Sequence, residues 1–456
     1  MGIREGGAPA PDLRARAGMT IRASTGLEAL GEPGRMSTVF FNAASRGDAL
    51  RLLDDRYLFN VATYAPEIDT KYIYTYAYQP DESWTRYRGD LTGESYRRGE
   101  YLFSGPCYFR VCLKRADGGG LTDAEAARIG SVLEFRPAVG PRPCGPPEKP
   151  FIALESERAA RRVRERAAGD SLAFALLSDS HIVVNGCWDD TLASLRALHG
   201  MVGFDGIIHL GDITDGMVTA EATRRYAGEA VSGLLSLGAP LYITIGNHDA
   251  NYFAGNPEPF SVDEQCALYL AHSDGYTSRE PGCPWYYRDF PEHGLRFVFL
   301  HSFDPGEAVR YGFSDGCLRW LRDTLGSMPR GFRAMAFSHL TPLVELQCWT
   351  DRIRGGDELA AILEGCAARP GGGLAAFVNG HSHVDQVYSG LSFPIVSIGC
   401  SKPECFSEHK PAGSFTPPRR LGEASQELWD VMLVTPSAGR IDFVRYGAGF
   451  DRSLRL

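Results

Sequence analysis

The sequence predicts an α/β domain with buried sheets, preceded by a small β-rich module. Six apolar runs between residues 172 and 378 alternate with helical stretches, which is the pattern of strands buried on both faces. Shorter β-like runs, broken by turn residues, fill the region from 57 to 134. Six prolines between Arg136 and Pro150 form a stiff connector that separates the two parts.

The composition excludes several classes of protein. The chain has 456 residues, of which 44% are apolar and 23% charged, and no apolar run reaches the roughly 18 residues that a membrane span needs. A net charge of −9 argues against dedicated nucleic-acid binding, which needs a basic surface. The eleven cysteines are scattered without a CxxC pair, and the N-terminus lacks the apolar segment of a secretory signal. We therefore expect a cytoplasmic protein without integral membrane association.

The same patterns divide the chain into four regions. We expect residues 1–50 to be disordered or poorly packed, because their first part contains glycine and arginine but no apolar run. Residues 51–136 form the β-rich accessory module and residues 137–150 form the Pro-rich linker. Residues 151–456 form the α/β domain, which also contains all eleven histidines.

The accessory module has two recognisable local patterns. Tyr72, Tyr74, Tyr76 and Tyr78 alternate with smaller residues and predict a strand with one aromatic face. That face is either a stacking platform for a sugar or, as we favour, a half-buried sheet surface. Residues 122–125 have the spacing of a helix capping box.

Within the α/β domain the elements follow one another in a regular order. Residues 153–168 combine helix formers with many charges and predict an exposed helix or connector. The predicted strands are 172–177, 206–210, 241–245, 295–300, 332–337 and 374–378, and a hairpin over 431–446 follows them. An aromatic insertion at 252–287 is either a cleft wall or ordinary packing. A second insertion at 402–426 includes Arg419 and Arg420, which either recruit a phosphate or belong to a surface loop.

Five of these strands are followed by short polar clusters. The clusters are Asp179-Ser-His181, Gly211-Asp212-Ile-Thr-Asp215, Gly246-Asn-His-Asp249, Ser338-His339 and Gly380-His-Ser-His383. Because loops at the carboxyl ends of strands converge in α/β folds, we expect these clusters to meet. Carboxylate, imidazole and amide oxygen without thiolate are the ligands of a hard or borderline metal ion. His209 and His301 also lie near strand ends, and we expect both to be structural, with their hydrogen bonds satisfied.

The ordered clusters resemble the pattern D-x-H, GD, GNH[DE], H and GHxH of the calcineurin-like metallophosphoesterase family, over roughly residues 172–446. The resemblance implies a four-layer fold, in which a β-sandwich of two sheets is flanked by helices and two metal ions lie at one edge. By position, the first metal would be held by Asp179, His181 and His383, the second by Asn247, His339 and His381, and Asp212 would bridge them. Two divalent metal ions are implied as cofactors, with Mn²⁺ favoured and iron, zinc or magnesium as alternatives.

The resemblance also implies catalytic roles. His248 matches the family's non-ligand histidine, which protonates the leaving oxygen or stabilises charge in the transition state. Asp215 is similar to the residue that orients this imidazole, and its carboxylate would keep the ring protonated. Asp249 is a weaker candidate for a supporting role. Two divalent ions, the carboxylates of Asp179 and Asp212 and a bridging hydroxide leave a net charge of about +1 to attract phosphate.

Departures from related patterns narrow the function. Asp215 stands where purple acid phosphatases have tyrosine, and Gly216 follows it where protein Ser/Thr phosphatases have arginine. The layout resembles the bacterial phosphoesterase and phosphodiesterase branch, which implies hydrolysis of a phosphoric ester, with a phosphodiester favoured, by a metal-bridging hydroxide. A phosphomonoester phosphatase with the same centre is the first alternative, and a metal-free binding or structural protein that kept the fold is the second. The accessory module would bind a glycan or a protein, or only pack against the catalytic domain.

Overall fold

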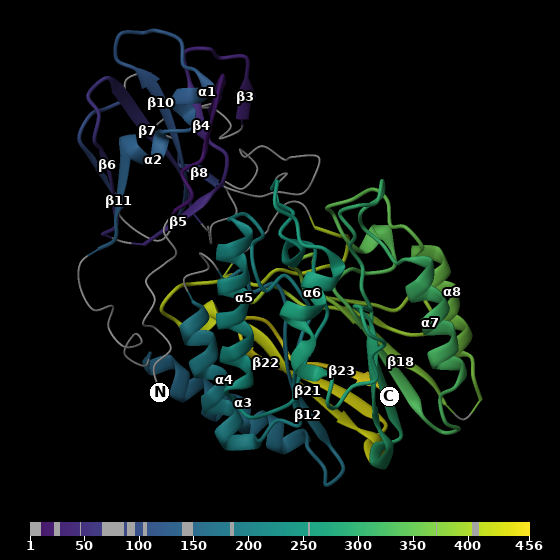
Figure 1. The fold of residues 1–456 in the computed structure, drawn as a ribbon. Helices are drawn as coiled ribbons and strands as arrows, with labels where there is room; N and C mark the ends of the chain where they lie inside the picture. The colour runs from purple at the N-terminus through teal and green to yellow at the C-terminus, as the bar shows by residue number, and fades with distance from the viewer. Residues whose placement is uncertain are drawn as a thin grey trace. The chain divides into compact units, whose positions relative to one another are not determined.

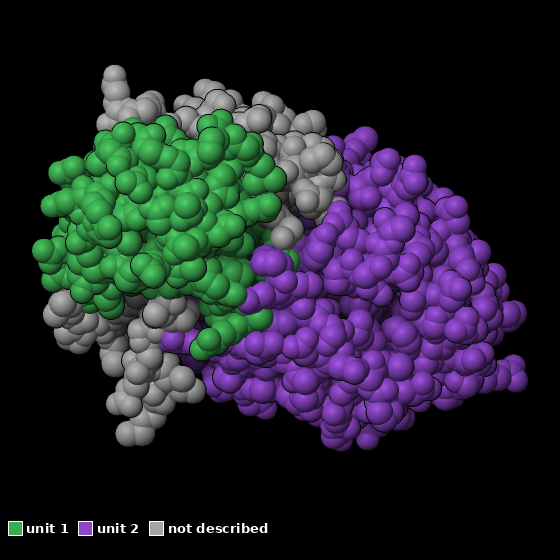
Figure 2. Space-filling model, turned by 45° about the horizontal axis from the view of Figure 1, so that its top comes forward, with its two compact units in different colours: residues 1–145, 217–223, 253–256 green, residues 146–216, 224–252, 257–456 purple. Residues whose placement is uncertain are grey.

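The computed structural model describes residues 11–21, 28–45, 47–65, 86–88, 96–103, 107–138, 149–182, 187–253, 256–370, 372–403 and 410–456. The chain forms two compact units, which are coloured separately in Figure 2. The first unit comprises residues 1–145, 217–223 and 253–256, and the second comprises residues 146–216, 224–252 and 257–456. Among the described helices, none has the length and apolar character that crossing a bilayer requires.

The first unit is rich in short strands. Its largest sheet has the order β1 (Ala15–Ala17), β4 (Met36–Thr38), β10 (Cys107–Arg115), β7 (Tyr57–Ala65) and β8 (Arg86–Arg88), with β5 (Asn42–Ala44) also paired to β10. A second sheet joins β11 (Leu133–Arg136), β6 (Ala49–Leu52) and β9 (Glu100–Leu102), and β2 (Met19–Ile21) pairs with β3 (Glu28–Leu30). The short helices are α1 (Asp123–Ala126) and α2 (Ile129–Val132).

The described residues between 11 and 50 differ from the expected disordered or poorly packed segment. Met36 on β4 and Leu50 on β6 are fully buried in one cluster with Phe59 and Phe109. These strands are only three or four residues long, so the sequence offers too few positions for a period of two to be recognised. The tyrosine run 72–78 and most of the expected linker, residues 139–148, lie outside the described residues.

The capping box of the first unit is confirmed. The Thr122 side chain accepts a hydrogen bond from the backbone N–H of Glu125, and the Glu125 carboxylate accepts one from the backbone N–H of Thr122. Both otherwise unsatisfied donors at the start of α1 are thereby satisfied.

The second unit has the four-layer α/β architecture that the resemblance implied. One six-stranded sheet has the order β14 (Leu241–Ile243), β13 (Gly206–His209), β12 (Leu172–Leu177), β21 (Leu428–Thr435), β22 (Arg440–Gly447) and β23 (Arg452–Arg455). The other has the order β15 (Tyr286–Phe290), β16 (Leu295–Phe299), β17 (Arg333–Ser338), β18 (Gly373–Asn379), β20 (Ile395–Ser397) and β19 (Gln386–Tyr388). Its helices are α3 (Pro150–Arg166), α4 (Trp188–Val202), α5 (Ala220–Leu235), α6 (Val262–Tyr269), α7 (Asp315–Gly326) and α8 (Gly356–Ala367).

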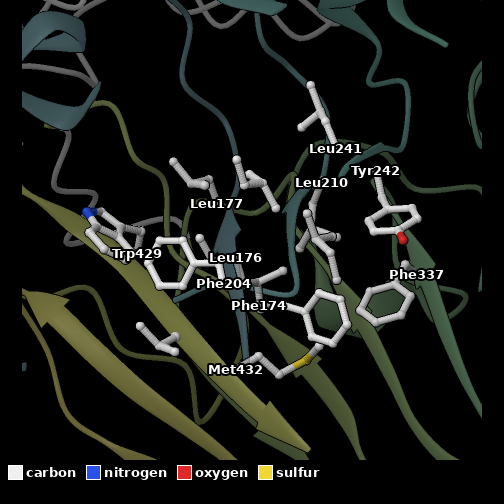
Figure 3. Packing of buried hydrophobic residues seen from close by; sticks show 14 of the residues in the cluster. Phe174, Leu176, Leu177, Phe204, Leu210, Leu241, Tyr242, Phe337, Trp429 and Met432 are labelled. Atoms are coloured by element: carbon white, nitrogen blue, oxygen red, sulfur yellow. The ribbon is translucent and has the colours of Figure 1, made fainter. Parts of the chain in front are cut away.

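Alternating apolar side chains hold these layers together. On β16, Phe297 and Phe299 pack into the core shared with the first sheet, whereas Val298 packs into the cluster beneath α7 and α8. This alternation is the period of two expected of a strand that is buried on both faces. Figure 1 shows α3 and α4 on one side of the pair of sheets and α7 and α8 on the other. In the core between the layers, Phe174 on β12 pairs in register with Met432 on β21 (Figure 3).

The structure corrects one expectation about the second unit and decides, for Tyr286, between two alternatives that the sequence left open. The segment expected to be an exposed helix or connector is α3, and its face containing Ala159, Ala160 and Val163 is buried in the core. The aromatic insertion contains α6 and strand β15, and the hydroxyl of the fully buried Tyr286 donates a hydrogen bond to the carbonyl of Ile243 at 2.9 Å. Tyr286 therefore packs in the core.

The pairing of the strands places the expected polar loops at one edge. β12 pairs in parallel with β13, and β13 pairs in parallel with β14, so their carboxyl ends point the same way. In the other sheet, β17 is parallel to β18. The five clusters found in the sequence follow the ends of these strands.

Candidate metal centre

All seven predicted metal ligands lie together in the second unit. Oxygen and nitrogen atoms of Asp179, His181 and His383 lie within 4.8 Å of one another, and so do those of Asp212, His339 and His381. The seventh, Asn247, places its side-chain oxygen 3.0 Å from Nε2 of His339. Five loops that span two hundred residues of sequence thus supply one cluster, as the sequence predicted.

The first group is compact enough to share one ion. Nε2 of His181 lies 3.3 Å from Nε2 of His383, and Nε2 of His383 lies 3.2 Å from Oδ1 of Asp179. Ligands of a single ion at about 2.0–2.2 Å are separated from one another by about 3–4 Å. The second carboxylate oxygen of Asp179 is already used, because it accepts hydrogen bonds from the Ser178 hydroxyl and from the backbone N–H of His381.

The second group centres on His339. Its Nε2 lies 3.2 Å from Nδ1 of His381 and 3.2 Å from Oδ2 of Asp212. Its Nδ1 lies 2.8 Å from the carbonyl oxygen of Leu210 and donates a hydrogen bond to it, which orients Nε2 towards the other donors. Oδ2 of Asp212 also lies 3.9 Å from Nε2 of His181, so this one oxygen faces both groups. These atoms fit a pair of divalent ions bridged by a carboxylate.

The backbone of the site is bent into an unusual conformation. In the described part of the chain, six residues other than glycine have positive φ angles, and Asp179, His181, Asp212, His381 and His383 are five of them. A left-handed conformation costs a residue with a side chain about 1 kcal/mol or more, and such strain collects at functional sites. Three of the five loops therefore use strained backbone to direct their side chains to one place.

Two glycines allow the loops to approach each other. A Cβ atom on Gly246 would collide with the carboxylate of Asp212, and one on Gly380 would collide with the side chains of Ser178 and Asp179. The glycines of the GNH and GHxH motifs are thus required by packing between loops.

Burial and mutual attraction shift the pKa values of the carboxylates and imidazoles of the cluster in opposite directions. Burial opposes ionisation of Asp179, but the attraction of His383 and His339 lowers the pKa of its carboxyl to about 2. Burial likewise favours neutral His339, but Asp212 outweighs it and raises the pKa of that imidazole to about 9. Burial and the neighbouring His339 lower the pKa of His381 well below its ordinary value. Ionised carboxylates beside imidazole nitrogens, which give up their protons when a metal ion binds, are a donor set that suits divalent cations.

His248 and Asp215 lie in the site, but their relation differs from the expected one. Nδ1 of His248 lies 2.8 Å from the backbone carbonyl of Asp215, whereas Oδ1 of the Asp215 carboxylate lies 2.9 Å from Nδ1 of His181. The carboxylate therefore faces a predicted ligand, and the backbone carbonyl of Asp215 contacts His248. Burial lowers the pKa of His248, although Asp212 and Asp215 oppose this shift. Donor atoms of His248, His181 and Asp212 lie within 4.8 Å of one another and form a third group that could hold a metal ion.

Asp249 joins the loops of the site. It is fully buried, and its carboxylate accepts hydrogen bonds from the backbone N–H groups of Ile213, Thr214 and Gly246 at 2.9–3.1 Å. Burial and the nearby Asp212 raise the pKa of Asp249 to about 7. Its contacts agree with the supporting role expected for it.

The other two strand-end histidines behave differently from each other. His209 is satisfied as expected: its Nε2 lies 2.7 Å from the Ser180 hydroxyl, and its Nδ1 accepts a hydrogen bond from Gly211. His301 is also buried, but within the described residues its Nε2 has no hydrogen-bond partner, contrary to expectation. Burial lowers the pKa of His301 to about 4, so the ring stays neutral without one.

Sequence reasoning missed two side chains at the site. The indole N–H of Trp349 donates a hydrogen bond to the carbonyl of His381 at 3.0 Å, and Nζ of Lys402 lies 3.9 Å from Oδ1 of Asp215. Neither residue belongs to a motif, and both come from loops far along the chain from their partners. Arg419, which we considered as a phosphate contact, is instead buried among backbone carbonyls, and Arg420 is an exposed partner of Glu423.

Fold and site together define an α/β protein with a buried His/Asp cluster suited to metal ions. Residues 172–385 match the family model of the calcineurin-like phosphoesterases, and all five loops of the cluster lie in this range. This part of the chain is therefore similar to the calcineurin-like phosphoesterases. Members of the family use a dinuclear metal centre, and the donor groups of this chain fit one.

Other comparisons concern the fold. A dimetal phosphatase from Danio rerio is 15% identical, with 62% of this chain and 98% of that chain covered at a TM-score of 0.46. Phosphopantetheinyl hydrolase from Mycobacterium tuberculosis is 13% identical, with 54% and 95% covered at a TM-score of 0.33. None of the curated proteins compared with the chain matches it.

Proposed function

We propose that this protein hydrolyses a phosphoric ester by means of two divalent metal ions, with a phosphodiester as the favoured substrate. The observation that carries the proposal is the position of Asp212. One oxygen of its carboxylate faces His339 at 3.2 Å and His181 at 3.9 Å, so that the two donor groups meet at this atom. Asp179, His181 and His383 would hold one ion, and Asn247, His339 and His381 the other. Bound there, the ions would lower the pKa of water and stabilise charge on the phosphoryl oxygens.

His248 is the residue proposed to protonate the leaving oxygen. The backbone carbonyl of Asp215 accepts a hydrogen bond from its Nδ1, which leaves Nε2 on the side of Asp212, 3.9 Å from Oδ2. Because burial lowers the pKa of His248, the protonated ring is a stronger acid than an ordinary imidazolium. The side chain is 12% exposed, so a substrate can reach it.

The preference for a phosphodiester rests on the resemblance of the layout to the bacterial phosphodiesterase branch. Two divalent ions, two carboxylates and one hydroxide leave a net charge of about +1, which attracts the phosphate of either ester. We also propose that residues 151–456 hold the catalytic domain and that residues 51–136 are an accessory module. No histidine precedes His181, so the module contributes none to the centre. Its glycan or protein ligand stays a prediction.

The test is hydrolysis of bis-p-nitrophenyl phosphate and p-nitrophenyl phosphate by protein reconstituted with Mn²⁺. We expect activity in the wild type and activity at background in Asp212→Ala and His339→Ala, because each variant removes a donor from the second group. His293→Ala is the matched control, since His293 lies on a surface 3-10 helix (Pro291–His293) of the same unit. Binding of less than about one equivalent of divalent metal by the wild-type protein would contradict the proposal.

A further inference from the structure

Lys402 is a buried cation that the proposed mechanism does not use. It lies in the loop after β20 and is 7% exposed, and its Nζ lies 3.9 Å from Oδ1 of Asp215. Its backbone N–H donates a hydrogen bond to the carbonyl of Asp179 at 3.1 Å, and the preceding N–H of Ser401 donates one to the carbonyl of Ser178. The lysine is thus attached at its main chain to the strand end that carries the first group of donors.

A second cation fixes the loop that presents Lys402. The guanidinium of Arg419, which is 4% exposed, donates hydrogen bonds to the carbonyls of Cys400 at 2.9 Å and Ser401 at 3.2 Å, and also to that of Ser425 at 2.9 Å. Because the main chain is held from both sides, little backbone entropy remains to be lost when Lys402 binds a ligand. Lys402 therefore lies beside the centre, whereas Arg419 stabilises the loop by hydrogen bonds to its backbone.

The side chains in and around the centre differ in how far they are exposed to solvent. The side chains of Asp179, His339 and Asp212 are 0–2% exposed. Those of His248 and His383 are 12% exposed, and that of Lys402 is 9% exposed. The main chain of Lys402 adjoins Asp179, while its ammonium adjoins Asp215, whose carbonyl holds His248. Lys402 therefore lies along the accessible rim of the centre.

We propose that Lys402 is a substrate-binding residue whose ammonium binds a non-bridging oxygen of the scissile phosphoryl group. The proposal rests on the proposed function, since it places the phosphoryl group at the same centre. An ammonium offers N–H donors and a full positive charge, which a phosphate oxygen accepts well. At 3.9 Å the pair with Asp215 is longer than a charge-assisted hydrogen bond of about 2.7–2.9 Å.

The test compares Lys402→Gln and Lys402→Arg with the wild type in the Mn²⁺-loaded full chain. Arg420→Gln is the control, because Arg420 is a 76% exposed cation of the same insertion. We expect Lys402→Gln to raise KM for p-nitrophenyl phosphate, and the inhibition constant of inorganic phosphate, by about tenfold to a hundredfold. The effect on bis-p-nitrophenyl phosphate is smaller because this ester carries one negative charge instead of two. Lys402→Arg keeps the charge and recovers most of the affinity.

Three outcomes decide the matter. Equal constants for Lys402→Gln and Arg420→Gln would overturn the proposal. It would also be overturned if Lys402→Gln raised KM for both esters by the same factor and lowered the unfolding midpoint, because Lys402 would then only balance the charge of Asp215. If the metal-loaded wild type hydrolysed neither ester, the proposed function would fail by itself. Calorimetric titration with inorganic phosphate would still confirm or refute phosphate binding by Lys402.

Discussion

Two buried polar clusters of the second unit differ in how their charges are compensated. In the cluster of Asp385, Asp430, Arg445 and Arg452, the guanidinium of Arg445 donates hydrogen bonds to both carboxylates at 2.7–3.2 Å. Arg445 is 1% exposed, and its charge and that of Arg452 cancel those of the two aspartates. In the metal centre, by contrast, carboxylates face imidazole nitrogens. Burial alone therefore does not mark a functional site, whereas buried carboxylates that face titratable imidazoles in place of permanently charged guanidinium groups do.

The largest expected effect comes from removing one cation from the cluster of arginines and aspartates. Arg445→Met should lower the free energy of unfolding by about 3–5 kcal/mol, because it leaves two buried carboxylates with one cation. Urea unfolding measures the change. Arg322→Met is the control, since Arg322 and Glu358 form a pair in which both side chains are about half exposed; its loss should cost about 1 kcal/mol or less. Equal destabilisation by the two variants would remove the distinction between the clusters.

In the metal centre, removal of one side chain should lower the catalytic rate and leave the free energy of unfolding nearly unchanged. His248→Ala is expected to keep both metal ions and to lose roughly a hundredfold or more in kcat, as for a general acid. Metal content by atomic emission and steady-state kinetics check this together. Loss of metal in the variant would instead place His248 among the ligands, where its proximity to His181 and Asp212 would also allow it.

A smaller effect separates the two functions of Asp215. Asp215→Asn should weaken metal binding by about tenfold to a hundredfold, because its carboxylate contacts the far nitrogen of His181. At saturating metal, kcat should stay within a few-fold of the wild type, since the carbonyl that holds His248 is unchanged. Competition with a metal-sensitive dye gives the affinity. Unchanged affinity with a rate loss like that of His248→Ala would restore the role first expected for this carboxylate.

The smallest effect concerns a carboxylate that is compensated by a proton. Burial raises the pKa of Glu427 to about 7 from 4.5, although Gln426 and Thr191 donate hydrogen bonds to its carboxylate. The folded chain holds a proton that the unfolded chain has released, so this group contributes its full stability below about pH 4.5 and loses it as pH rises through about 7.

Glu427→Gln stays neutral at every pH and should remove this dependence. Relative to the wild type, the variant should gain free energy of unfolding between pH 5 and pH 8, because only the wild type loses a proton held in the folded state over this range. Urea unfolding at both pH values measures the gain, with Glu423→Gln as an exposed control from a nearby segment. A gain of the same size in the control, or none in Glu427→Gln, would contradict the assignment.

The strands that carry the centre could be predicted because composition alone defines them. β12 spans Leu172–Leu177 as expected, since a continuous apolar run buried on both faces has few other structures available to it. β15 was missed because Tyr286–Phe290 lacks that pattern and becomes a strand through edge pairing with β16. The strands of residues 11–50 were missed because each is too short to show a period.

Within the site, too, some features could be predicted from the sequence and others could not. The motifs identified the side chains that converge, because each motif places its chemistry directly after a strand. The conformation of the turn between β13 and α5 determines which atom of Asp215 contacts which histidine. The residue types in the turn do not predict that conformation. Lys402 was missed because its contact with Asp215 joins loops that are far apart in the chain, and a single lysine has no spacing to recognise.

The left-handed backbone of the predicted ligands has a consequence for descendants of this protein. A lineage that no longer needed metal would lose selection for aspartate and histidine at these five positions but would keep the bends. Glycine and asparagine adopt such bends at the lowest cost, whereas alanine or valine would add strain to each of the three loops that contain them. Loss of the metal would therefore leave glycine and asparagine in place of the motifs. Relatives with such replacements would be recognisable from sequence as proteins that kept the fold and gave up the chemistry.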